Sequence, residues 1–152
     1  MSVPVRLPES FLVPTPPRSR LRAVPSPGAS PSAWTLLAQA RQGLLQAEHE
    51  PDAAERFVRA HLAALRAAAA VLALRGRPHR TRTKPMSAWV LLAKVAPEFA
   101  EWASFFQSCA STRHAVESGI TRLVSARSAD DLVRQAGQFV ELVDRAVHGA
   151  GR

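Results

Sequence analysis

The chain has 152 residues, of which 47% are hydrophobic, and a formal net charge of +8 at pH 7. A chain of this length can bury one hydrophobic core and is too short for two substantial domains. Its single cysteine, Cys109, excludes an internal disulfide, and no apolar run approaches the roughly 18 residues of a membrane span. We therefore expect one soluble, cytoplasmic domain with no membrane contact.

The positive charge is confined to two segments. Residues 1–30 contain four arginines and one glutamate, together with many of the prolines, and they show neither a helical nor a strand-like period. Proline fixes φ and removes a hydrogen-bond donor, so we predict a disordered Pro/Arg-rich tail over residues 1–30. The second segment, residues 75–85, is predicted to be a basic loop without any acidic residue; its cations are Arg75, Arg77, Arg80, Arg82 and Lys84. The rest of the chain carries 11 basic and 11 acidic residues and is neutral.

The first two predicted helices follow the tail. Apolar residues recur at helical spacing in SAWTLLAQARQGLLQAE, with Ser32 as the N-cap, until the break at residues 49–51. The second helix is predicted from about Pro51 to Leu74, since proline suits the first turn of a helix. It is rich in alanine, and small side chains let partner helices approach closely. We therefore expect this helix to be central.

The remaining helices follow the basic loop. Ser87 is the predicted N-cap of a helix over residues 88–96, and Pro97 must end it. A further helix is predicted from Pro97 to roughly residue 114, with a buried side consisting of Phe99, Trp102, Phe105, Phe106 and Cys109. Ser128 and Asp131 resemble a capping box at the start of the last helix, which ends before residue 149. The fold class is therefore all-α: an antiparallel bundle of four to five helices over residues 31–149.

The order of four segments resembles an actinobacterial family of HEPN-domain proteins. These segments are LLAQARQGLLQA, AERFVRAHLAALRAAAAVL, SAWVLLAKVAPEFAEWASFF and SADDLVRQAGQFVELV, and the resemblance covers about residues 32–147. It implies an antiparallel helical bundle that is often a homodimer. Some HEPN families are metal-independent ribonucleases that act as toxins beside a nucleotidyltransferase-like antitoxin partner, whereas others bind nucleotides or have lost catalysis.

The six residues RFVRAH contain the R-x4-H spacing of HEPN ribonucleases, which makes Arg56 and His61 the candidate catalytic residues. The abundance of arginine alone predicts about two accidental matches over the three permitted spacings, x4, x5 and x6. Residues five apart on a helix are turned by about 140° from each other, so the pair would need a dimer interface or a distorted turn. The motif also lies earlier in the chain than in catalytic HEPN proteins. We favour a buried, neutral His61 that hydrogen-bonds a neighbouring helix, and an Arg56 that pairs with Asp52 on the surface.

The basic loop has two interpretations. Closely spaced arginines bind nucleic-acid phosphates with a salt-dependent affinity, but the loop has no aromatic residue for base stacking, and a solvated connector is the alternative. The three tryptophans are expected to be core anchors and Cys109 a small buried hydrophobe. No pair of histidines has the spacing of a metal site, so we expect no metal and no cofactor.

Three hypotheses about function follow. The leading one is a non-catalytic HEPN-like module that assembles with itself or with a partner and contacts nucleic acid or nucleotide through the basic loop. The second is a metal-independent ribonuclease that uses Arg56 and His61 across a dimer interface. The third is a protein–protein scaffold.

Overall fold

The computed structural model describes residues 31–76 and 86–150, so the predicted tail and most of the predicted basic loop lie outside the described residues. All elements within the described ranges are helical. They are α3 (Pro31–Glu48), α4 (Ala53–Arg75), α5 (Ala88–Val95), the short 3-10 helix η1 (Pro97–Phe99), α6 (Ala100–Glu117) and α7 (Ala126–Ala150). The predicted all-α bundle of four to five helices is confirmed.

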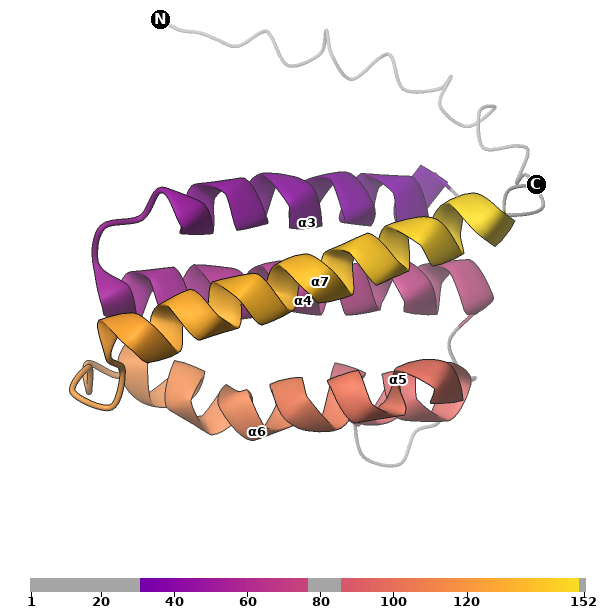
Figure 1. Cartoon of the computed structure of the whole chain (residues 1–152). Helices are drawn as coiled ribbons and strands as arrows, with labels where there is room; N and C mark the ends of the chain where they lie inside the picture. Colours follow the sequence, from indigo (N-terminus) through magenta and orange to yellow (C-terminus); the bar gives the residue numbers. More distant parts are fainter. Residues whose placement is uncertain (1–30, 77–85, 151–152) are drawn as a thin grey trace, which may run out of the picture.

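Helix α4 lies at the centre of the bundle. It packs against α3, α5, α6 and α7, and Figure 1 shows α3 on one side of it, α5 and α6 on the opposite side, and α7 crossing over it. The side of α4 that faces these helices is lined by fully buried alanines, namely Ala60, Ala63, Ala64, Ala67, Ala68 and Ala70. Because methyl side chains are small, the axes of neighbouring helices can approach closely, and four elements can pack against one helix. The predicted central position of this helix is confirmed.

Local capping contacts set the helix boundaries. Ser87 Oγ accepts a hydrogen bond from the Val90 amide at 3.2 Å, and α5 ends before Pro97, both as predicted. Helix α4 begins two residues later than predicted, because Asp52 accepts from the Glu55 amide at 2.9 Å and is the N-cap.

The predicted capping box of Ser128 with Asp131 is wrong. The Ser128 amide donates to Ser125 Oγ at 3.0 Å, and the Ser125 amide donates to Ser128 Oγ at 3.0 Å. Ser125 is therefore the cap, and α7 begins at Ala126, three residues before the predicted N1 position.

Aromatic side chains from α5, α6 and α7 form the core beside α4. Phe106 and Phe139 are fully buried, with ring centroids 5.3 Å apart, and Trp89 stacks on Phe106 at 5.1 Å. Two expectations fail here. Trp34 is 39% exposed and makes an edge contact with His148 on α7, and Phe105 is also 39% exposed, since it lines an open hollow between α6 and α7.

Helix α4 is, contrary to the sequence expectation, long and apolar enough to cross a membrane. Of its most apolar window, 61% is buried inside the bundle by the helices around it. Core helices of soluble proteins have the same composition, and the burial of α4 is that of a core helix.

Candidate functional site

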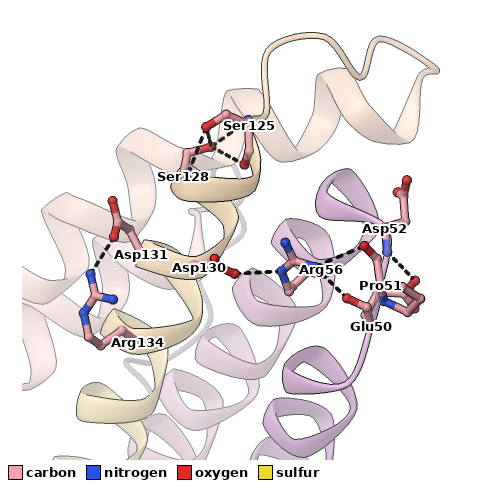
Figure 2. A network of polar contacts seen from close by, with 9 residues as sticks. All are labelled: Glu50, Pro51, Asp52, Arg56, Ser125, Ser128, Asp130, Asp131 and Arg134. Carbon is pink, nitrogen blue, oxygen red and sulfur yellow. Dashed lines mark hydrogen bonds and ion pairs between the residues drawn. The ribbon is translucent and has the colours of Figure 1, made fainter.

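Arg56 holds the connection between α3 and α4 against the first turns of α7. Its Nη1 donates to the carbonyl oxygens of Glu50 at 2.7 Å and Pro51 at 3.2 Å, and its Nε forms an ion pair with Asp130 Oδ1 at 3.1 Å. Figure 2 shows the side chain between these groups. The predicted ion pair with Asp52 is wrong, because Asp52 caps α4 and the guanidinium turns toward α7. Only 14% of the Arg56 side chain is exposed.

His61 points from α4 toward α6. It is the one polar residue among the buried residues of the described chain, with 0% exposure, and its Nε2 lies 2.8 Å from the Phe106 carbonyl oxygen. A carbonyl oxygen only accepts, so we assign the ring proton to Nε2. The Nδ1 lone pair is buried and has no hydrogen-bond partner among the described residues. The predicted buried histidine that hydrogen-bonds a neighbouring helix is confirmed.

Burial disfavours the charged form of this imidazole. Desolvation lowers the pKa of His61 below its ordinary value of 6.5, and the nearby positive charges of Arg113 and His114 lower it further. The hydrogen bond to Phe106 and the negative charge of Glu117 act in the opposite direction and are outweighed.

Among the nearby cations, Arg113 lowers the pKa of His61 most. The sequence did not predict that these two residues are neighbours. Its Nη1 donates to Glu117 Oε2 at 3.3 Å and its Nη2 contacts His114 Nε2 at 3.2 Å, so its charge is already partnered. The available signal was helical spacing: Arg113 follows Phe106 by seven residues, about two turns, and therefore lies on the same side of α6.

The structure does not bring Arg56 and His61 together within one chain. Arg56 reaches α7 and the connection before α4, whereas His61 reaches the backbone of α6. This divergence agrees with the turn of about 140° between helix positions five apart. Both side chains are engaged by groups of the fold itself.

Only one of the predicted nucleic-acid-binding residues can be placed. Arg75 is the last residue of α4 and forms an ion pair with Glu98 at 2.6 Å, a hydrogen bond that also lowers the pKa of Glu98. Arg77, Arg80, Arg82 and Lys84 lie outside the described residues. Within residues 31–76 and 86–150 there are 11 basic and 11 acidic side chains, so the described body is neutral.

Metal and thiol chemistry find no support in the described part of the chain. No group of three or more histidine, cysteine, aspartate or glutamate side chains is placed there to hold a metal ion. Cys109 is half-buried rather than fully buried, and burial raises the pKa of its thiol. A thiol with a raised pKa is a poor nucleophile at neutral pH.

Comparison with known proteins identifies the class to which this helical bundle belongs. The sequence profile of the SAV_6107-like HEPN family matches residues 47–144, which include α4, α5, α6 and most of α7. The chain therefore belongs to the SAV_6107-like HEPN family. No curated protein and no solved structure matches it.

Proposed function

We propose that the chain is a non-catalytic HEPN module that works by assembling with a second protein chain, either its own copy or a partner. The observation that supports this proposal is the burial of His61, which has 0% exposure and donates its Nε2 proton to a backbone carbonyl. Its setting is proposed to be the cytoplasm, and its membership of a HEPN family supports the assignment as a HEPN module.

The contacts of His61 and Arg56 count against the ribonuclease alternative. A histidine that moves a proton must come within hydrogen-bond reach of the substrate hydroxyl, and an arginine that stabilises phosphate must present free N–H groups. His61 is enclosed by α4 and α6, and Arg56 is committed to Glu50, Pro51 and Asp130. Cleavage through this pair would need the first turns of α4 to open.

A cleavage assay tests the proposal. Purified chain is incubated with single-stranded RNA in the presence of EDTA, beside the His61→Ala and Arg56→Ala variants and a His148→Ala control, whose ring is exposed. We expect no cleavage by any of the four. Metal-independent cleavage that is lost in His61→Ala, while His148→Ala remains active and both variants stay folded, would establish the ribonuclease and overturn the proposal. That outcome would also favour an antitoxin-like partner, because an active toxin must be restrained.

Nucleic-acid binding through the basic loop is a second candidate, and the distribution of charge favours it. The described body is neutral, so the net charge of +8 resides in the residues outside it. The four loop cations beyond Arg75 have no acidic residue among them in the sequence. Such a cluster binds phosphate with an affinity that falls steeply with salt.

A matched pair of triple variants tests this candidate. Arg77, Arg80 and Arg82 are changed to Gln in one variant, and the exposed Arg66, Arg122 and Arg145, which form no ion pair among the described residues, are changed to Gln in the other. Both variants lose three charges. We expect the salt slope of RNA binding to flatten only in the loop variant. Equal losses in both variants would show attraction by net charge alone, and absence of binding at low salt would leave the scaffold role.

A further inference from the structure

Helix α6 has an outward side that no other described element covers. Among its 18 residues only Ala103 and Phe106 are buried, and Phe106 contacts His61 of α4. The opposite side presents the exposed residues Ser104, Ser108 and Ser111, which recur at helical spacing and form a low ridge. In Figure 1 this helix is the outermost layer on the side of α4 away from α3.

An open hollow flanks each side of this ridge. The hollow between α5 and α6 has a volume of about 480 Å³ and an apolar floor that includes Trp89, Ala93 and Ala103. The hollow between α6 and α7 has a volume of about 330 Å³ and is lined by Glu101, Trp102, Phe105 and Gln135. Phe105 stands at the edge of the second hollow and is 39% exposed, so one face carries both an apolar cavity and an apolar side chain of fitting size.

Two opposite charges of this face are also without partners. Lys94 lines the α5–α6 hollow and Glu101 lines the α6–α7 hollow, and neither forms an ion pair or a hydrogen bond with any described residue. Most other charges of the described body are paired. The two charges lie on opposite sides of the ridge, one beside each hollow.

We propose that two copies of the chain pair through this α5–α6 face, with Phe105 of each copy inserted into the α5–α6 hollow of the other. The geometry points to a two-fold axis parallel to α6. Such an axis places the α5 side of one ridge against the α7 side of the other, at the same height along α6. Phe105 directly follows Ser104, which lines the α5–α6 hollow, so the two residues lie at nearly the same height. The same operation sets Lys94 of each copy opposite Glu101 of the other, so the free charges are mutually complementary.

This inference rests on the proposed role in assembly, and it specifies the partner and the surface. The decisive experiment is sedimentation of the full chain over a range of concentrations, with Lys94→Glu, Glu101→Lys and the double exchange. Each single reversal places like charges together and is expected to raise the dimer dissociation constant tenfold or more. The double exchange restores opposite charges and with them the dimer, whereas Arg145→Glu, an exposed and unpaired site on α7, leaves the constant unchanged.

A second variant keeps the proposal testable by a different contact. Phe105→Ala removes the apolar insertion and is expected to give monomers that retain the wild-type helix content well below the melting temperature, because the ring lies at the surface of α6. In a Cys109→Ser background, Ser104→Cys lies close to the proposed axis and is expected to crosslink to its own copy under oxidation, whereas Ser118→Cys, at the end of α6, does not.

The outcomes separate this inference from the proposed function. A wild-type chain that stays monomeric at hundreds of micromolar overturns the pairing, as does a dimer that tolerates Phe105→Ala and both charge reversals. In the second case assembly stands and only the assigned face fails. RNA cleavage that depends on His61 overturns the proposed function and leaves the sedimentation result unaffected.

Discussion

His61 is an imidazole whose two ring nitrogens have unequal surroundings. Nε2 is satisfied by the Phe106 carbonyl at 2.8 Å, while Nδ1 is buried without a partner among the described residues. The rings of Trp89 and Phe106 pack beside it with centroids at 5.8 Å and 6.2 Å. This residue therefore behaves as a large packing group with one directional bond, which joins α4 to α6.

Removal of His61 is expected to destabilise the fold. His61→Ala leaves a cavity at a fully buried position and deletes the contact between α4 and α6, so the free energy of unfolding should fall by about 2–4 kcal/mol. Urea denaturation followed by circular dichroism measures the difference. His49→Ala is the control, and we expect a change below about 0.5 kcal/mol because its side chain is exposed and contacts only the Leu45 carbonyl one turn away. Equal effects of the two variants would contradict the packing role.

Stability should also fall with acid in a way that depends on His61. Burial lowers its pKa below 6.5 in the folded chain, so the unfolded chain binds more protons as the pH falls below that value. The contribution is fully present above about pH 6.5 and is lost as the pH drops toward the lower folded pKa. Urea titrations between about pH 7.5 and 5.5 should show a steeper loss in wild type than in His61→Gln. Parallel curves would mean that the folded and unfolded rings bind protons alike.

The connection between α3 and α4 depends on a side chain rather than on its own backbone. Arg56 bonds two carbonyls of that connection and also faces Asp130 on α7, as Figure 2 shows. One guanidinium thus fixes the place where three helix ends meet. This explains why Arg56 is largely covered although it belongs to the first turn of α4.

The two kinds of contact made by Arg56 should differ in strength. Arg56→Ala removes charge-assisted hydrogen bonds to partly buried carbonyls and is expected to reduce the free energy of unfolding by about 1–3 kcal/mol. Asp130→Ala should reduce it by less than about 1 kcal/mol, because the carboxylate is 63% exposed and solvent screens the pair. Chemical denaturation of both variants checks the order, and a larger effect of Asp130→Ala would reverse the assignment.

The start of α7 supplies another prediction at this scale. Ser125→Ala deletes the hydroxyl that accepts from the Ser128 amide and should destabilise the chain by about 1 kcal/mol. Ser111→Ala, on the exposed side of α6, is the matched control with little expected change. If Ser125→Ala is as stable as the control, the helix is capped elsewhere.

The sequence predicted those elements whose signals are local. Ser87 and Pro97 mark the ends of α5 by backbone chemistry alone, and the alanines of α4 foretold a central helix. The remaining features depend on tertiary packing, which the sequence does not show directly. Periodicity assigned Phe105 and Trp34 to the core because it cannot tell which helix faces remain uncovered, and Ser125 was missed because a serine at the third helical position replaced the usual acidic residue of the box.

The candidate site, too, could be predicted only in part from the sequence. Helical spacing already showed that Arg56 and His61 diverge, and burial of His61 followed from the stripe it shares with Phe57 and Ala64. The partners of Arg56 could not be foreseen, since Asp130 lies 74 positions away and comes near only through the crossing of α7 over α4. The binding of nucleic acid by the basic residues from Arg77 to Lys84 remains a prediction.

At the scale of the whole molecule, the described helical body carries no net charge. A neutral helical body surrounds α4, and the net positive charge belongs to residues outside that body. Its interior encloses the histidine of the only R-x4-H pair, while its outer helix carries the uncovered face. The proposed non-catalytic role therefore depends on the enclosure of His61.

The most direct measurement of that enclosure is an NMR titration of the imidazole nitrogens in uniformly ¹⁵N-labelled chain. We predict that His61 keeps the Nε2–H tautomer, exchanges this proton slowly with water, and is less than half-protonated at pH 6.5, because burial lowers its pKa. The exposed His49 supplies the reference for a ring in contact with solvent. A His61 ring that is half-protonated at pH 6.5 and exchanges as rapidly as His49 would contradict the account.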